Sequence, residues 1–294
     1  MKILCFYCED SKKSEPASLH LGVKLPDGVF DLTAAGYQGD LAWTIENWPA
    51  SQQQIADAMA SKQVSLLDEN TLKYAPPAPV GAKIICVGQN YRGHIKEMAK
   101  GGPVPVIKEP VLFAKFSDTL SAHEASVTLP QGETIQYDYE TELVAIVGRG
   151  GMNIPKDQAL SHLFGYTCGN DLTERDAQMR STQWLIGKTL PGFAALGPSI
   201  TTTDEMDAAD ISIKGYRNGE LVQDTSSSDL LFDIPSLVSY ASRFIQLNPG
   251  DLIYTGTPSG VIASKDPESR CWLTPGETFD VTIEGIGTLR TYFI

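Results

Sequence analysis

The chain has 294 residues, which is enough for one large domain or for one large and one small domain. Hydrophobic residues make up 42% and charged residues 20%, as in ordinary globular proteins, while 26 Gly and 18 Pro indicate many turns and a β-rich fold. The net charge of −13 argues against nucleic acid and anionic membranes as partners, because both attract basic surfaces. An acidic small molecule is not excluded, since a bound metal ion can reverse the charge locally.

The first 77 residues have the pattern of a small β-rich domain. Strands are expected at 2–8 and on both sides of the hairpin sequence at 26–28, and a short helix is expected at 51–63. Three prolines in "YAPPAPVGAK" indicate a linker, so we predict one domain at 1–77 and a larger one at 78–294. The N-terminal apolar run is too short for a signal peptide and no apolar stretch could span a membrane, which makes the cytoplasm the expected location.

Strands are expected to dominate the larger domain as well. The predicted strands lie at 83–88, 111–118 and 137–148, in a hairpin around Asn218-Gly219, and at both ends of 251–294. Helical patterns occur at 92–102, at 153–165 between a possible cap at Asn153 and a stop at Gly165, and at 233–251. Because no alternation of strand and helix is evident, the predicted fold class is a β-rich α+β fold.

The stretch "DYETELVAIVG" combines an apolar strand with acids at its start. Asp138, Glu140 and Glu142 alternate, so on an extended chain they share one face, about 6.6 Å apart. At an effective dielectric of about 20, two carboxylates at that distance repel by roughly 2.5 kcal/mol. Two interpretations are open: a solvated strand end, or a site for a hard divalent cation, which prefers clustered oxygen ligands.

Three further stretches carry chemistry with an equally plain alternative. His94 and Glu97 share one side of a helical turn, either as a general base with its orienting carboxylate or as a surface pair. Asp171, in "GYTCGNDLTERDAQ", either completes a set of metal ligands or belongs to an acidic helix start. Lys188, the one charge in "WLIGKTLPGFAALG", either reaches the surface or is buried against an anion.

Taken together and in this order, the motifs resemble the fumarylacetoacetate hydrolase superfamily. The resemblance covers about residues 78 to 265 and is carried by "VGQNYRGHIKEM", "EPVLFAKFSD", "DYETELVAIVG", "GYTCGNDLTERDAQ", "WLIGKTL", "NGELVQDTSSSDLLF" and "GDLIYTGTPSGV". It implies a mixed β-sandwich roll with a small β-rich N-terminal domain, and a homodimer. An acid that fumarylacetoacetase adds to its metal site is missing at 89–91, which points to a smaller, bacterial-type relative.

The resemblance also implies roles for nine residues, five of which would bind the metal or activate water. Glu140, Glu142 and Asp171 would hold one Mg²⁺ or Mn²⁺, and His94 with Glu97 would activate water on a segment that can order as a lid. Asp138 remains without a role.

The resemblance places the remaining residues around a keto-acid substrate. Lys188 would stabilise a developing enolate, and Arg175, Gln178 and Thr257 would contact the substrate. The implied reaction is metal-dependent hydrolysis of a carbon–carbon bond in a 2,4-diketo acid such as an acylpyruvate. The alternative is a decarboxylase, dehydratase or isomerase that acts on an oxaloacetate-like or 2-keto-3-deoxy sugar acid through an enolate. A non-catalytic binding protein is disfavoured, because the three acids and the lysine are all present.

Overall fold

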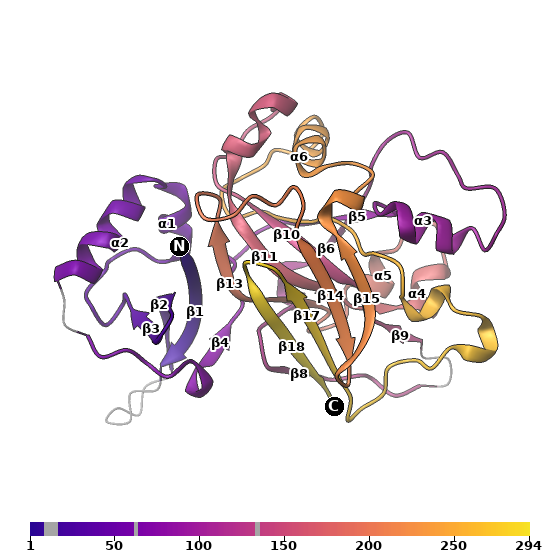
Figure 1. The fold of residues 1–294 in the computed structure, drawn as a ribbon, viewed down its shortest axis with the longest axis horizontal. Helices are drawn as coiled ribbons and strands as arrows, with labels where there is room; N and C mark the ends of the chain where they lie inside the picture. The colour runs from indigo at the N-terminus through magenta and orange to yellow at the C-terminus, as the bar shows by residue number, and fades with distance from the viewer. Residues whose placement is uncertain (9–16, 62–63, 133–135) are drawn as a thin grey trace.

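A computed structural model describes residues 1–8, 17–61, 64–132 and 136–294 of the chain (Figure 1). Within these ranges most strands belong to two sheets, one of eleven and one of five strands, and the remaining two strands pair with each other. The β-rich α+β class predicted from the sequence is therefore confirmed. The last two residues of the helix predicted at 51–63 lie outside the described residues.

The eleven-stranded sheet runs in the order β3-β2-β1-β13-β11-β10-β16-β5-β6, with β4 beside β1 and β7 beside β13. Its strands are β1 (Lys2–Cys8), β2 (Ser18–Leu25), β3 (Gly28–Asp31), β4 (Lys73–Ala75), β5 (Ile84–Gly88), β6 (Val111–Lys115), β7 (Leu120–Ser121), β10 (Thr141–Val147), β11 (Leu163–Asp171), β13 (Ala194–Thr202) and β16 (Leu252–Tyr254). The five-stranded sheet consists of β15 (Glu220–Ser226), β14 (Ser212–Arg217), β17 (Thr278–Ile283), β18 (Gly287–Phe293) and β8 (Ala125–Val127). The separate pair is β9 (Tyr137–Asp138) with β12 (Thr173–Glu174).

Helices are short and lie around the edges of the sheets. The α-helices are α1 (Leu41–Glu46), α2 (Ala50–Ser61), α3 (Arg92–Met98), α4 (Arg175–Met179), α5 (Leu185–Lys188) and α6 (Ile234–Ser242). The 3₁₀ helices are η1 (Glu69–Thr71), η2 (Ser117–Thr119), η3 (Lys156–His162), η4 (Ser227–Asp229), η5 (Ile262–Ser264) and η6 (Pro267–Ser269). In the part of the chain that the structure describes, no helix is long and apolar enough to cross a bilayer.

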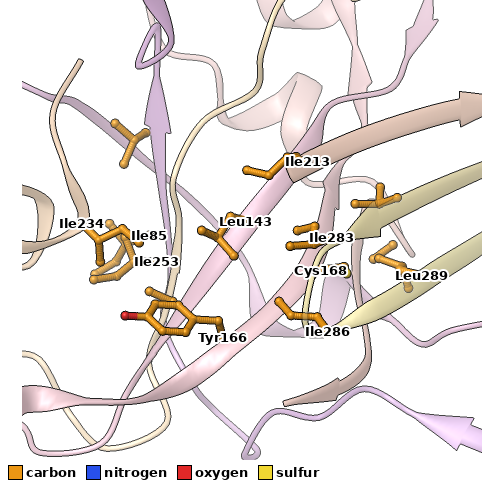
Figure 2. Packing of buried hydrophobic residues seen from close by; sticks show 14 of the residues in the cluster. Ile85, Leu143, Tyr166, Cys168, Ile213, Ile234, Ile253, Ile283, Ile286 and Leu289 are labelled. Carbon is orange, nitrogen blue, oxygen red and sulfur yellow. The ribbon is translucent and has the colours of Figure 1, made fainter. Parts of the chain in front are cut away.

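Strand β10 lies at the centre of the molecule and is buried along its whole length. It pairs antiparallel with β11 on one side and with β16 on the other. Leu143 and Ala145 pack into the core between the two sheets, where Figure 2 shows Leu143 beside Ile213 and Ile283 of the facing sheet. Val144 and Ile146 pack into the core on the opposite face. Burial on both faces explains why the strand is apolar without interruption from Leu143 to Val147.

The first strand of the chain joins the large sheet directly. Lys2 and Ile3 of β1 pair with Thr201 and Ile200 of β13, so the sheet continues from the N-terminal residues into the rest of the molecule. In Figure 1, β1 lies beside β13 at the left of the molecule. The division at residue 77 stays a prediction, and the sheet passes across it.

The predicted helix at 153–165 is wrong in type and extent. Asn153 has a φ of 52°, the only helical turns nearby in the described residues are the 3₁₀ turns of η3, and Gly165 lies in β11. A Cβ at Gly165 would approach the Thr201 carbonyl oxygen to 2.4 Å, so glycine permits two strands to meet there and does not end a helix. The helix predicted at 233–251 ends at Ser242, which leaves Phe244 64% exposed.

Candidate active site and metal centre

Three carboxylates converge at the end of β10. Glu142 lies in β10, Glu140 precedes it, and Asp171 ends the neighbouring strand β11, where its N–H donates to the Glu140 carbonyl at 3.0 Å. All three are buried, and each offers an oxygen within 4.8 Å of the other two. Glu140 and Glu142 thus meet Asp171 of the neighbouring strand. The alternate spacing of the first two acids in the sequence could not show this approach by itself.

Asp138, the third acid of the alternating set, lies outside this cluster. Its carboxylate accepts hydrogen bonds from the N–H groups of Ile262 and Ala263 at 2.8 and 3.0 Å and pairs with Arg175 at 2.9 Å. The strand predicted at 137–148 is broken between Asp138 and Thr141, so the acids do not all share one face. Asp138 holds η5 and Arg175 against the site.

Three cations surround the acid cluster. The Lys188 ammonium lies 2.8 Å from Glu140 and 2.7 Å from Asp171, so this lysine is buried against anions. Arg175 contacts the other oxygen of Glu140 at 2.7 Å. Lys115, at the end of β6, pairs with Asp171 and donates to the Leu172 carbonyl at 3.0 Å.

With all four of its carboxylates ionised, this buried group has one negative charge too many. Asp138, Glu140, Glu142 and Asp171 carry four negative charges when ionised, against three positive charges on Lys115, Arg175 and Lys188. Burial raises the pKa of Glu140, but Lys188 and Arg175 lower it to about 2.

Glu142 is the acid of this group whose ionisation is least favourable. Burial, together with Asp171 and Glu140, raises the pKa of Glu142 well above its usual value. Oxygen donors of this kind suit Mg²⁺ or Mn²⁺, and a divalent ion would favour the ionised form of Glu142. The residues present therefore fit a divalent metal.

A cavity of about 210 Å³ opens at this cluster. Six of the nine residues predicted for the site line it, namely His94, Glu140, Arg175, Gln178, Lys188 and Thr257. A larger cavity of about 460 Å³, between α6 and η4, is lined by none of the nine. We place the chemistry in the smaller cavity because the acid cluster lies at its base.

His94 and Glu97 lie on α3 at the edge of the cavity. The His94 Nδ1 and a Glu97 carboxylate oxygen are 3.7 Å apart, and Glu97 accepts from the Gly260 N–H at 3.1 Å. Burial raises the pKa of Glu97, but contacts with His94, Gly260 and Ser264 lower it below its usual value overall. An ionised carboxylate beside an imidazole can hold the ring in one orientation.

The other predicted contact residues have partners of their own. Gln178 accepts from Arg175 at 3.1 Å, and the Thr257 hydroxyl accepts from Gln223 at 3.0 Å. The part of Gln178 and Thr257 in binding substrate stays a prediction. The same holds for the roles predicted for the metal ligands and for the dyad of His94 and Glu97.

Two residues that support the site were missed in the sequence. Lys115 is a lone lysine at the end of the apolar stretch "VLFAK". Lys188 shows the same pattern of one lysine in apolar surroundings, so this pattern could have identified Lys115. Gly187 packs α5 onto α4 so closely that a Cβ would lie 2.5 Å from the Gln178 nitrogen and the Glu174 carbonyl oxygen. This glycine sets the place of Lys188, the next residue.

The chain is similar to known proteins along most of its length. The family described as Fumarylacetoacetate (FAA) hydrolase C-terminal matches residues 83–294. The chain is 33% identical over 287 residues to oxaloacetate tautomerase fahd2, mitochondrial, of Xenopus laevis, covering 95% of this chain and 87% of the relative.

Two solved structures are similar along the whole chain. Maleylpyruvate hydrolase from Sphingobium sp. SYK-6, in complex with manganese(II) ion and pyruvate, has a TM-score of 0.80 and 25% identity, covering 100% of this chain and 99% of that chain. The structure of 5-carboxymethyl-2-hydroxymuconate delta-isomerase from Mycobacterium smegmatis has a TM-score of 0.76 and 26% identity. The similarity covers 100% of this chain and 99% of that chain.

Proposed function

The chain belongs to the fumarylacetoacetate hydrolase family, whose named relatives are hydrolases, tautomerases and isomerases, and from this premise we propose that it hydrolyses a carbon–carbon bond in an acylpyruvate-like 2,4-diketo acid. The observation that carries the proposal is one cavity lined by Glu140 of the acid cluster, Lys188 and the His94 imidazole. A base, a cation and a metal site around one small space are the groups that this reaction needs.

Glu140, Glu142 and Asp171 would hold the ion, either Mg²⁺ or Mn²⁺. When bound, the ion supplies Lewis-acid polarisation of the keto-acid oxygens. The Lys188 ammonium lines the same cavity and stabilises negative charge that develops on the keto acid.

The dyad on α3 supplies the nucleophile. His94 takes a proton from water, and the ionised Glu97 stabilises the imidazolium that results. The hydroxide attacks the acyl carbonyl at C4 of the substrate, and the bond between C3 and C4 breaks with its electron pair staying on C3. The pyruvate enolate then takes the proton from His94, so the products are pyruvate and a carboxylic acid.

A second candidate function is tautomerisation of a 2-keto acid. It is supported by the similarity to an oxaloacetate tautomerase over 95% of this chain. In this case His94 would move a proton at C3 of the substrate, and no water would attack. Decarboxylation and dehydration would use the same enolate but have no separate observation in their favour.

A product assay separates the two candidates. The protein, loaded with Mn²⁺ or Mg²⁺, is given acetylpyruvate and the enol form of oxaloacetate, with EDTA as the metal-free control. Pyruvate released from acetylpyruvate supports hydrolysis, whereas faster loss of the enol without pyruvate release supports tautomerisation. Turnover that EDTA leaves intact would contradict both.

Substitution of the dyad tests the role of water attack. Glu97→Ala should slow hydrolysis by roughly 10²- to 10⁴-fold, the usual contribution of general acid–base catalysis, while oxalate still binds. Lys188→Ala should slow every reaction that passes through the enolate. If Glu97→Ala hydrolyses acetylpyruvate as fast as the parent protein, the water-attack assignment is wrong. Keto-acid binding, homodimer formation and cytoplasmic location stay part of the proposal.

A further inference from the structure

We infer that this cavity selects keto acids whose far end is uncharged and apolar, and that it disfavours a second carboxylate there. The inference rests on the proposed function, because it assumes that the keto-acid end of the substrate lies at the acid cluster. It concerns the part of the substrate that neither the fold nor the family determines.

Much of the lining of the cavity is apolar. Besides the six polar site residues, the cavity is lined by Val87, Gly88, Gln89, Met98, Phe113, Met179 and Trp184. Five of these residues are hydrophobic and form an apolar wall, to which β5, α3, β6, α4 and the residue before α5 each contribute one. A keto acid with its polar end at the metal centre would therefore extend its other end along this wall.

Two aromatic rings form the firmest part of the wall. Phe113 and Trp184 pack edge to face, with ring centroids 5.4 Å apart and planes at 71°. Trp184 lies against the backbone of Gly88, where a Cβ would come within 2.5 Å of the indole ring. Glycine at this position thus creates the space that the indole occupies. Lys188 lies over the Phe113 ring, 5.0 Å from its centroid, which joins the apolar wall to the polar end.

The cations of the cavity are already engaged by protein carboxylates. Among the lining residues that the structure describes, the permanent cations are Arg175 and Lys188. Arg175 pairs with Asp138 and Glu140, and Lys188 pairs with Glu140 and Asp171. His94, the other titratable base, has Glu97 as its neighbour at 3.7 Å. A second substrate carboxylate would find no free positive partner along the wall.

These observations give a direction of selectivity. Moving an unpaired carboxylate from water to an apolar wall is unfavourable. Burying one methylene group against the wall should instead strengthen binding about fourfold. An alkanoylpyruvate with a short chain therefore fits the cavity better than a dicarboxylate of the same length.

Binding of N-alkyl oxamates to the Mn²⁺-loaded protein tests the inference without requiring turnover. Oxamate presents two adjacent oxygens as a 2-keto acid does, and its nitrogen carries the variable group. From N-methyl to N-propyl oxamate the dissociation constant should fall by roughly 16-fold, about fourfold for each methylene. N-(2-carboxyethyl) oxamate, which matches the propyl chain in length, should bind no better than N-methyl oxamate. Equal binding of all three, or tightest binding of the carboxyethyl compound, would overturn the inference.

A rim substitution should weaken the preference. Met179 is 74% exposed at the mouth of the cavity, so Met179→Arg adds a cation without burying it. We expect this variant to bind the carboxyethyl compound about two- to fivefold more tightly relative to the propyl compound, the magnitude of one exposed charge pair. Met179→Leu keeps the apolar rim and should retain the parent preference. If arginine changes nothing, the wall does not contact the far end of the ligand.

Failure of the inference and failure of the proposed function give different results. If oxalate and every oxamate fail to bind in the presence of Mn²⁺, the keto-acid site itself is wrong. If oxalate binds but the alkyl chain has no effect, the keto-acid site stands and the apolar specificity is wrong.

Discussion

Lys115→Met is expected to destabilise the metal-free protein strongly. The Lys115 side chain is fully buried, pairs with Asp171 and donates to the Leu172 carbonyl. Methionine has a similar length without the charge, so the change leaves Asp171 with one fewer cation. Removing one partner of a buried ion pair costs about 3–5 kcal/mol. With an unfolding entropy of about 2.1 cal/mol/K per residue over the chain, Tm should fall by roughly 5–8 °C.

Thermal unfolding in EDTA, followed by circular dichroism, measures this shift. Lys156→Met is the matched control, because Lys156 is 57% exposed and pairs with Asp233 at the surface. An exposed pair contributes about 0–1 kcal/mol, so the control should lose less than about 2 °C. Mn²⁺ should then raise Tm more in Lys115→Met than in the parent, since the ion replaces the lost positive charge beside Asp171.

Two outcomes would refute this reasoning. A Tm loss in Lys115→Met no larger than in Lys156→Met would mean that the buried pair contributes no more than a surface pair. An equal effect of Mn²⁺ on parent and variant would mean that the ion and Lys115 do not share Asp171.

Three further predictions concern the metal and the packing beneath it. Mn²⁺ at 100 times its dissociation constant should stabilise the parent protein by about 2.7 kcal/mol, measured as a rise in Tm that EDTA reverses. Because burial and two acidic neighbours raise the pKa of Glu142, metal binding should release a proton and affinity should increase with pH until Glu142 ionises. Calorimetry in two buffers of different ionisation enthalpy counts that proton, and binding without proton release below neutral pH would contradict the assignment. Gly187→Ala should lower both Tm and metal-dependent turnover. The alanine Cβ would lie 2.5 Å from the Gln178 nitrogen and the Glu174 carbonyl oxygen and would force α5 to shift. An unchanged Tm and an unchanged turnover would show that α5 can move freely.

The acids of the cluster could be recognised in the sequence, but their function could not be decided there. Glu140 and Glu142 start a strand that is otherwise apolar, and this pattern alone left both a solvated strand end and a cation site open. Their approach to Asp171 depends on the register between β10 and β11, in which Thr141 faces Asn170. Spacing in one strand contains no information about that register, so the third ligand came from the resemblance.

Other features required the folded chain. Whether Lys115 points into the core or out to solvent depends on what covers the end of β6, and α4 and α5 are brought there by the fold. Gly165 was interpreted as a helix stop because glycine ends helices often, whereas close approach of β13 is the actual reason for it. The exposed position of Phe244 likewise follows from where α6 ends, which the helical pattern alone did not show.

The pairing of β1 with β13 has a consequence for the order in which the chain folds. Lys2 and Thr201 are partners although 199 positions separate them in the sequence. During synthesis the hairpin of β2 and β3 can form at once, and β1 can pair with β2. The opposite edge of Lys2 and Ile3 has no partner strand until β13 has been made. Such distant pairing slows folding and leaves a strand edge open in the meantime. Nascent chains stalled before residue 194 should therefore bind chaperones or associate with one another more than chains stalled after 202.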